Sequence, residues 1–232
     1  DSVTEKPFKT IDSENEERIF KYVDTNSGKA KIGAIASKLK EQKVAIIGLG
    51  GTGSYILDMI SKTPVREIHL FDGDLFLQHN AFRSPGASSL VELQALKKKT
   101  EYFQTHYSNI RINIISHNYY IDNHNIDELL GMNFVFICID KSDIKKVIID
   151  NLVSHGISFI DTGIGVINID DSLIGHIRVT TSTPDMREHI KTRIAFNDDG
   201  GKNDYSTNIQ IAELNALNAA LAVIKWKKLF GY

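Results

Sequence analysis

An α/β fold with a mostly parallel sheet is predicted from three features of the sequence. Short apolar runs alternate with helical stretches, a glycine-rich turn follows the first run, and the composition lies within the globular range. The chain has 232 residues, of which 42% are hydrophobic and 24% charged, which is enough to bury the core of one domain. We divide it into a polar N-terminal segment, residues 1–30, and one folded domain, residues 31–232.

Four apolar runs of strand length form the parallel part of the predicted sheet. Helical stretches separate them, and this alternation is typical of a parallel sheet with helices on both faces. A short helix is expected before the first strand, over residues 31–38. The four strands are expected at residues 44–47, 67–71, 110–115 and 134–139.

The last third of the sequence predicts a hairpin, a loop and a long helix. An apolar run that begins at residue 158 passes two glycines, reaches a turn at residues 170–172 and is followed by an alternating run at 174–179. This pattern predicts an antiparallel hairpin that extends the sheet. Polar residues 182–207 then predict a loop, and the pattern over 208–229 predicts a closing helix.

Composition and charge exclude several classes of function. The net charge is -2 and the pI about 6.5, so no basic surface for nucleic acid is expected. The apolar runs are much shorter than the ~20 residues that cross a bilayer, so we expect no membrane partner. Cys138 is the single cysteine, which excludes an internal disulfide and a zinc site built from cysteine pairs. This cysteine usage, and an N-terminus unlike a secretory signal, predict a cytoplasmic protein.

A glycine-rich turn follows the first predicted strand. Gly48, Gly50 and Gly53 form a Gly-x-Gly-x-x-Gly pattern between that strand and a helical stretch, which is typical of a Rossmann-like fold. Gly48 allows the tight turn, and Gly50 and Gly51 leave room for a phosphate to reach backbone N–H groups at the helix start. The alternative is a turn needed only for close packing of strand and helix. The pattern does not separate proteins that bind NAD, FAD, S-adenosylmethionine or ATP.

Polar residues after the second predicted strand favour ATP among these ligands. Asp72 ends that strand, where a carboxylate can accept both ribose hydroxyls of an adenosine, and Asp74 follows. A dehydrogenase would show the same acid. Asn80 and Arg83 come next, and a fixed cation there would stabilise the negative charge that develops when an AMP unit is transferred.

Three consecutive lysines lie farther along the chain. Lys97, Lys98 and Lys99 are on a helical stretch and close enough in sequence to reach the same phosphates. The alternative is a solvated helix face, and we expect that role for two of the three lysines.

Asp140 ends the fourth predicted strand at the carboxyl edge of the sheet, beside the predicted phosphates. A bare carboxylate would repel phosphate groups, but a carboxylate that coordinates Mg²⁺ would not. A nicotinamide-dependent enzyme gains nothing from an anion at this edge. The alternative is that Asp140 caps the helix that follows. These residues therefore predict ATP and Mg²⁺ as cofactors.

The motifs together resemble those of the ThiF/HesA/MoeB superfamily, which includes the adenylation domains of ubiquitin-activating enzymes. The resemblance covers nearly the whole chain and implies that residues 31–232 form a ThiF-type adenylation domain. Its parts are the glycine turn at 48–54, the acids at 71–74, the motif at 80–83, the basic helix at 97, residues 138–140 and the closing helix at 213–227.

The resemblance implies a role for each candidate residue. Asp72 would bind the ribose, Asn80 and Arg83 the phosphates of ATP, and Asp140 the Mg²⁺ ion. One of the lysines would stabilise the transition state, and we place this role on Lys97. The expected catalytic residues are thus Arg83, Lys97 and Asp140. The expected nucleotide-binding residues are Gly48, Gly50, Gly51, Gly53, Asp72, Asp74, Asn80, Arg83 and Lys97.

The activity implied is ATP- and Mg²⁺-dependent adenylation of the C-terminal carboxylate of a ubiquitin-like protein or peptide. The resemblance also implies a homodimer and a conjugating enzyme as a further partner. No cysteine follows Cys138 and no Cys-x-x-Cys pairs occur, so we expect neither a thioester nor zinc, as in a bacterial-type member that lacks the cysteine. The N-terminal arginine that relatives supply across a dimer has no clear match, and Arg18, Lys29 and Lys31 are the candidates.

Three other functions stay open on the sequence. A relative with the same fold could adenylate a peptide or a tRNA-linked small carboxylate. An oxidoreductase that uses a dinucleotide would share the glycine turn and Asp72, although Arg83 and Asp140 speak against it. A scaffold without catalysis would need none of the nucleotide-site residues.

Overall fold

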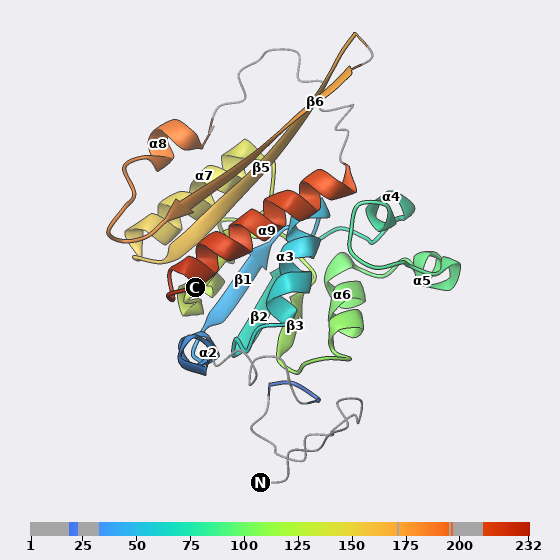
Figure 1. Ribbon diagram of the computed structural model, residues 1–232, viewed down its shortest axis with the longest axis horizontal. Coiled ribbons are helices and arrows are strands. Elements are labelled where there is room, and N and C mark those ends of the chain that lie inside the picture. Colours follow the sequence, from blue (N-terminus) through green and yellow to red (C-terminus); the bar gives the residue numbers. More distant parts are fainter. Residues whose placement is uncertain (1–18, 23–32, 171, 195, 197–210) are drawn as a thin grey trace.

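The computed structural model describes residues 19–22, 33–170, 172–194, 196 and 211–232 (Figure 1). Six strands form one sheet in the order β3-β2-β1-β4-β5-β6. All neighbouring strands are parallel except β5 and β6, which form an antiparallel hairpin. This confirms the predicted fold class. The strands are β1 (Lys43–Ile47), β2 (Glu67–Phe71), β3 (Ile114–His117), β4 (Phe134–Ile137), β5 (Ser158–Ile169) and β6 (Ser172–Ser182).

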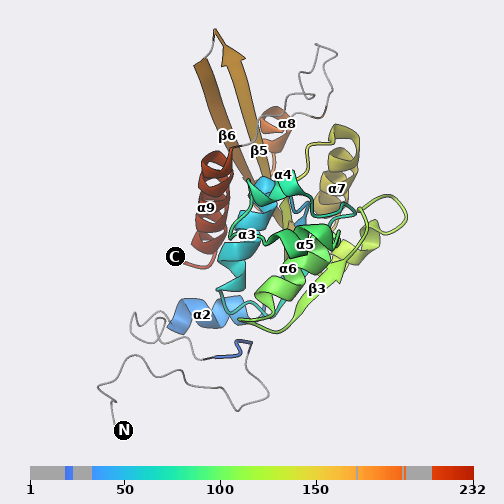
Figure 2. The same ribbon diagram turned by 90° about the vertical axis from the view of Figure 1, so that its right-hand side faces the viewer.

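Helices lie on both faces of the sheet, as the alternating pattern predicted (Figure 2). Helices α3, α6 and α9 cover one face, and η1, α7 and α8 cover the other. The helices are α2 (Gly33–Lys40), α3 (Gly51–Ser61), α4 (Gln78–Ala81), α5 (Leu90–Gln94), α6 (Lys99–Tyr107), the 3-10 helix η1 (Ile126–Gly131), α7 (Ser142–Ser154), α8 (Ile190–Arg193) and α9 (Ala212–Lys228).

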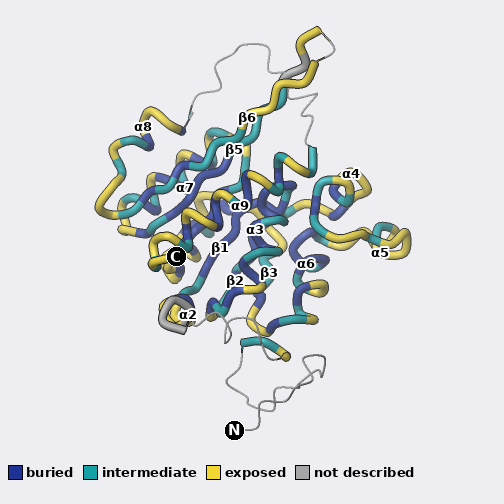
Figure 3. Tube along the Cα trace, viewed as in Figure 1, coloured by how far each residue is buried: buried dark blue, intermediate teal, exposed yellow. Residues whose placement is uncertain are grey.

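Strand β1 divides the core into two apolar clusters. Its side chains alternate, so Val44 and Ile46 pack with α3 and α9, whereas Ala45 and Ile47 pack with α7. A strand buried on both faces must be apolar throughout, which explains the run of residues without alternation. Figure 3 shows the central strands buried and the α4–α5 region and hairpin tip exposed. The core therefore fixes the central strands, and their carboxyl ends emerge from it.

The predicted start of the third strand was wrong. It was expected at residue 110, but β3 begins at Ile114 because Asn113 has a left-handed backbone with φ 61. Arg111 instead forms a bridge with Phe20, one of the few described residues of the polar segment 1–30. Its buried guanidinium donates hydrogen bonds to the carbonyl groups of Thr63 and Val65. The polar residue thus ends the strand pattern, and its side chain ties the loop before β3 to the loop between α3 and β2.

The β5–β6 hairpin confirms the predicted one: β5 covers the whole run from residue 158 to the turn, and β6 extends a few residues beyond the predicted run at 174–179. Its strands have 12 and 11 residues, whereas β1 has 5, so the hairpin projects beyond the rest of the sheet (Figure 1). The turn lies where the sequence placed it, since Asp170 has a left-handed φ of 48. Of the predicted loop at residues 182–207, residues 182–194 and 196 are described, and they include the short helix α8, which the sequence did not predict. The rest of that loop, and the start of the closing helix before residue 211, lie outside the described residues.

Candidate active site

The candidate site lies at the carboxyl ends of β1, β2 and β4. The chain leaves β1 toward β2 and β3 on one side, and β4, β5 and β6 lie on the other. The two halves of a parallel sheet diverge at such a point and leave a crevice, where ligands bind in open α/β sheets. The predicted site residues follow these three strand ends, so the topology brings them to one edge.

Three of the four glycines of the turn are required by the fold. Gly48 has a left-handed φ of +88, and a Cβ on Gly53 would lie 1.9 Å from the Gly48 carbonyl oxygen. A Cβ on Gly51 would lie 2.3 Å from the side chain of Asn215 on α9. At Gly50 a Cβ would meet nothing within 4 Å. Gly50 is therefore the glycine that borders open space, at the N-cap of α3, where backbone N–H groups can receive a phosphate.

Asp72 is held rigidly at the end of β2. The side chain is 4% exposed, and its Oδ2 accepts a hydrogen bond of 2.7 Å from the backbone N–H of Leu49. Oδ1 accepts one of 2.9 Å from the N–H of Asp74. These bonds orient the carboxylate beside the glycine turn, where a ribose would lie.

The lysine that reaches these acids is Lys99. It is 6% exposed, and its Nζ lies 3.4 Å from Oδ2 of Asp72 and 2.7 Å from Oδ2 of Asp74. Lys97, where the sequence placed the catalytic role, is exposed, and its carbonyl accepts the N–H of Phe76 at 2.8 Å. The structure therefore brings Lys99, and not the side chain of Lys97, to the predicted ribose acids.

Backbone pairing explains why Lys99 is the inward residue. Leu75 forms a bridge with Lys98, and the N–H of Lys99 donates to the carbonyl of Asp74 at 3.0 Å. The ammonium of Lys98 donates a hydrogen bond of 2.6 Å to the carbonyl of Gly73. Three consecutive lysines do not reveal in the sequence which of them points inward. In the structure, Lys99 is the first residue of α6.

The two lysine-bound acids differ in their surroundings. Asp74 is exposed, and burial of part of its carboxyl acts to raise its pKa. Hydrogen bonds from Lys99 and Tyr120 outweigh this effect, so the pKa of Asp74 is lower than usual. Asp74 therefore stays a carboxylate and holds the ammonium of Lys99 at the edge of the site.

Asn80 and Arg83 present unpaired donors. Asn80 is 2% exposed; its Oδ1 accepts the N–H of Leu77 at 2.9 Å, while its buried Nδ2 has no hydrogen-bond partner among the described residues. The buried Nε of Arg83 also has none there. Burial lowers the pKa of the Arg83 guanidinium, and the charge of Asp140 acts in the opposite direction. Buried donors without partners are rare, and phosphate oxygens would satisfy both.

Asp140 lies beyond the end of β4 and is exposed. Within the described part of the chain, no group of three or more His, Cys, Asp and Glu side chains could hold a metal ion. A Mg²⁺ site does not need three protein ligands, because the ion keeps several waters and binds proteins through one or two carboxylates plus substrate phosphates. A single exposed carboxylate beside a phosphate subsite therefore fits Mg²⁺.

A buried charge cluster on β5 was missed by the sequence interpretation. Asp161 is 0% exposed and pairs with Lys145 of α7 at 3.1 Å and with Arg178 of β6 at 2.7 Å. Asp161 is paired in register with Ile137, next to the edge that carries Asp140. Two cations and one carboxylate give the cluster itself a net positive charge. Lys145 and Arg178 are far apart in sequence, so no local pattern indicated the cluster.

Cys138, predicted as a buried strand residue, lies just after β4 and is partly buried against the core. Burial raises the pKa of its thiol to about 12, and the charge of Asp161 acts in the same direction. A thiol in this state is a poor nucleophile.

Among the described residues, no helix has the length and apolar character needed to span a membrane.

Comparison with known proteins gives one family. A model of the ThiF family matches residues 10–192. The ubiquitin-like modifier-activating enzyme 5 of Drosophila willistoni is 23% identical over 157 residues, which are 61% of this chain and 36% of that protein. The enzyme of the same name from Branchiostoma floridae is 26% identical over 155 residues, with 61% and 37% covered. The chain thus spans little more than a third of these relatives.

Solved structures share the fold. Escherichia coli MccB in complex with AMPCPP and MccA aligns with a TM-score of 0.69 and 18% identity, covering 90% of this chain and 64% of that one. PaaA aligns with a TM-score of 0.65 and 18% identity, covering 85% and 58%. MccB solved with ATP aligns with a TM-score of 0.65 and 19% identity, covering 86% and 59%.

Proposed function

Because the chain belongs to the ThiF family, we propose that it is an ATP-dependent adenylyltransferase that converts a carboxylate into an acyl-adenylate. The observation that carries the proposal is the pair of unpaired, buried donors on Asn80 and Arg83. They lie on the chain between the acids of β2 and Asp140, in the crevice that the glycine turn borders. Adenylation of a carboxylate requires hydrogen-bond donors at such a place, because negative charge develops on the phosphate oxygens as pyrophosphate leaves.

The residues divide the work of the reaction. Asp72 accepts the ribose hydroxyls, and the N–H groups beside Gly50 receive phosphate oxygens. Asn80, Arg83 and Lys99 stabilise negative charge on the phosphates, with Lys99 in the role that the sequence interpretation gave to Lys97. A carboxylate oxygen of the acceptor attacks the α-phosphorus, the bond from that phosphorus to the bridging oxygen breaks, and pyrophosphate leaves.

Asp140 would hold Mg²⁺, which supplies charge neutralisation at the phosphate oxygens. The acceptor carboxylate is already ionised at neutral pH, so no general base is required. Positioning and charge therefore account for the catalysis that this edge of the sheet can provide.

For the acceptor we propose the C-terminal carboxylate of a ubiquitin-like protein or a peptide. Support comes from the relatives, which are named as activating enzymes for a ubiquitin-like modifier, and from the fold shared with MccB bound to MccA. The net positive cluster of Lys145 and Arg178 lies on the side away from Asp72, where an anionic acceptor would approach. A homodimer, a conjugating enzyme as a further partner and a cytoplasmic location belong to the same proposal.

The test is ATP–pyrophosphate exchange with a panel of ubiquitin-like proteins that end in glycine, free peptides and small carboxylates. Lys99→Met should reduce exchange by about 100-fold, as expected for loss of one charge-stabilising group. Lys97→Met is the matched control and should exchange like the wild type, because its side chain is exposed. Asp140→Asn should lose exchange as well.

The panel also separates the alternatives. Exchange with small carboxylates alone would replace the protein acceptor by a small one. Failure of the wild-type chain to bind Mg·ATP in calorimetry would refute the proposal. Equal losses in Lys97→Met and Lys99→Met would remove the role given to Lys99.

A further inference from the structure

Tyr120 occupies a defined position above the β2 loop. It follows β3, and the ring packs so closely on Gly73 that a Cβ there would lie 2.8–3.0 Å from three ring atoms. The hydroxyl donates a hydrogen bond to Oδ1 of Asp74. The Tyr120 carbonyl accepts a hydrogen bond of 2.9 Å from Nδ2 of Asn125. Backbone, ring and hydroxyl are thus all fixed.

The same ring also reaches the other side of the crevice. Nζ of Lys141 lies 5.1 Å from the centroid of the Tyr120 ring, and Lys141 follows Asp140 directly. Gly73 belongs to the loop after β2, and Lys141 to the loop after β4. These two strands flank β1. Tyr120 therefore bridges the two loops that border the crevice, at its ribose end.

The side chain of Tyr120 is suited to stack on a nucleobase. The residue is 52% exposed, so much of its surface is free to contact a ligand. The hydrogen bond to Asp74 raises the pKa of Tyr120 to about 12, and burial adds to the effect. The hydroxyl therefore stays a donor at neutral pH. One oxygen of the Asp74 carboxylate accepts a hydrogen bond from Tyr120 and the other accepts one from Lys99, so one carboxylate positions both side chains.

We propose that Tyr120 is a positioning residue that forms the aromatic wall of the adenine pocket, on the ring surface over which Lys141 now lies. Adenine stacks on this surface and displaces the ammonium of Lys141, while Asp74 keeps the ring beside the ribose. This inference rests on the proposed function, because it requires that an adenosine occupies the crevice.

Two ligands distinguish the adenine wall from a general effect on the site. Mg·ATP carries the base, whereas inorganic tripolyphosphate carries only the phosphates. Tyr120→Leu removes the aromatic surface with little change in volume, and Tyr120→Phe keeps the surface but loses the hydroxyl. Tyr119→Leu is the matched control, because its hydroxyl also bonds a carboxylate, that of Glu128 at 2.8 Å, and its ring packs on Phe71 instead.

In calorimetry, Tyr120→Leu should bind Mg·ATP about tenfold more weakly than the wild type, in line with the effect of removing one base–aromatic stack. It should bind tripolyphosphate as the wild type does. Tyr120→Phe and Tyr119→Leu should bind ATP within about threefold of the wild type, since both keep the aromatic surface. Melting curves confirm that each variant is folded.

Equal ATP affinity of Tyr120→Leu and the wild type would overturn the inference. So would equal weakening of both ligands, or a loss in Tyr119→Leu as large as in Tyr120→Leu. In each of these cases the wild-type chain still binds ATP, so the proposed function stands. A wild-type chain that binds no ATP would overturn both.

Discussion

Gly50 and Gly51 are neighbours in the turn but meet different constraints. The space around Gly50 is open, whereas Gly51 is pressed against Asn215, which in turn accepts a hydrogen bond of 3.0 Å from the hydroxyl of Thr52. The sequence pattern treats these positions alike. The structure separates a glycine kept free for a ligand from a glycine needed for helix packing.

Alanine at these two positions should therefore affect different properties, the stability at Gly51 and ATP binding at Gly50. Gly51→Ala should lower the free energy of unfolding by about 1–3 kcal/mol, because the new methyl group overlaps Asn215. Gly50→Ala should leave the unfolding free energy nearly unchanged and weaken ATP binding, because the methyl group enters the space proposed for a phosphate. Urea unfolding and calorimetry on both variants check this. Reversed effects would show that the roles are exchanged.

Side-chain direction was the part of the site that the sequence could not predict. Asp72, Asn80, Arg83 and Asp140 were predicted from their positions after strand ends, which the apolar runs define, and their roles stay predictions. The inward lysine was not found, because the bridge of Leu75 with Lys98 depends on how two loops meet. Contacts of this kind are tertiary and leave no local periodicity.

At the scale of elements, β2 and β3 share a chain of hydrogen bonds on one face of the sheet. His69 Nδ1 lies 3.1 Å from His117 Nε2, and His117 Nδ1 lies 2.9 Å from the hydroxyl of Tyr119. The hydroxyl donates to Glu128 of η1. Burial lowers the pKa of His117, the charge of His69 lowers it further, and Glu128 opposes both. Neutral His117 therefore stabilises the packing of the two strands.

This lowered pKa predicts a loss of stability in mild acid. The unfolded state binds a proton at the ordinary pKa of ~6.5, above the folded pKa, so stability rises with pH in this window. The contribution of His117 is complete above pH ~6.5 and is lost as the pH falls through the folded pKa. His117→Gln should therefore lose less stability than the wild type between pH 7 and pH 5.

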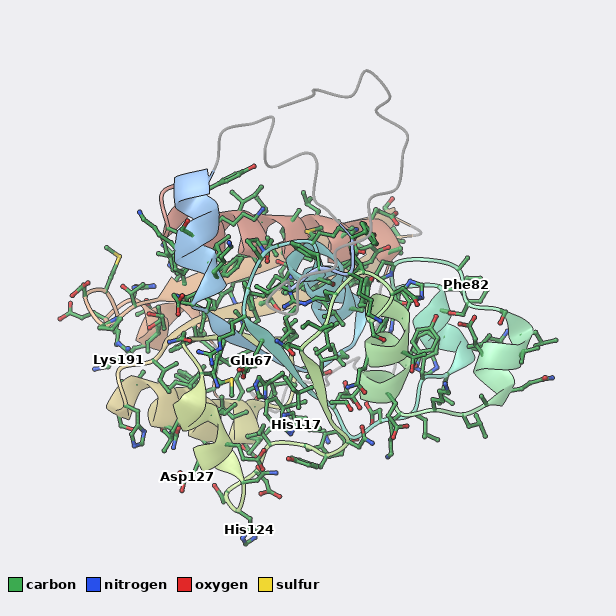
Figure 4. The ribbon with its side chains drawn as sticks, turned by 90° about the horizontal axis from the view of Figure 1, so that it is seen from below. Glu67, Phe82, His117, His124, Asp127 and Lys191 are labelled. Carbon is green, nitrogen blue, oxygen red and sulfur yellow. The ribbon has the colours of Figure 1, made fainter. Side chains whose placement is uncertain are left out.

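His124→Gln is the control, since His124 is exposed and points away from the protein, whereas His117 lies among other side chains (Figure 4). Urea midpoints at each pH provide the measurement. Glu67 and Asp74, whose pKa values are also lowered despite the opposing effect of burial, affect stability only at lower pH. Parallel pH curves for wild type and His117→Gln would contradict the prediction.

Trp226 packs helix α9 against β4 of the sheet. The side chain is 0% exposed and contacts Phe134 and Phe136 of β4, with ring centroids 6.3 and 6.1 Å away. Trp226→Ala should lower the free energy of unfolding by about 3–5 kcal/mol, the usual cost of removing a large core aromatic residue. Trp226→Phe should cost much less. Circular dichroism during urea unfolding measures both, and a loss below ~1 kcal/mol in Trp226→Ala would contradict this packing.

At the scale of the whole molecule, apolar runs were sufficient to predict the sheet and its layers. The run at residues 67–71 matched a strand at both ends, because Ile68, Leu70 and Phe71 are buried in the sheet. Errors occurred where one residue redirects the chain, as at Asn113. Strand β6 also extends beyond the predicted run at 174–179, because its last residues, 180–182, pair with β5 although they are polar.

Cys138 should report on unfolding of the whole molecule. It is the single cysteine, and its raised pKa leaves little thiolate in the native state. Iodoacetamide should label the native chain very slowly at pH 8, and labelling should accelerate in urea together with the change in Trp226 fluorescence. Rapid, complete labelling of the native chain would show that the thiol is accessible and would reopen its use as a nucleophile.

The strand order has a consequence for how this protein can diversify. Residues 43–117 supply β1, β2 and β3 with the ribose acids, and residues 134–182 supply β4, β5 and β6 on the other side of the crevice. Between β1 and β6 the chain crosses from one half to the other once. Under the proposed function, recombination within the connection at residues 118–133 could exchange the acceptor-facing half and keep the ribose acids intact. One inherited ATP module could thereby serve a series of different acceptors.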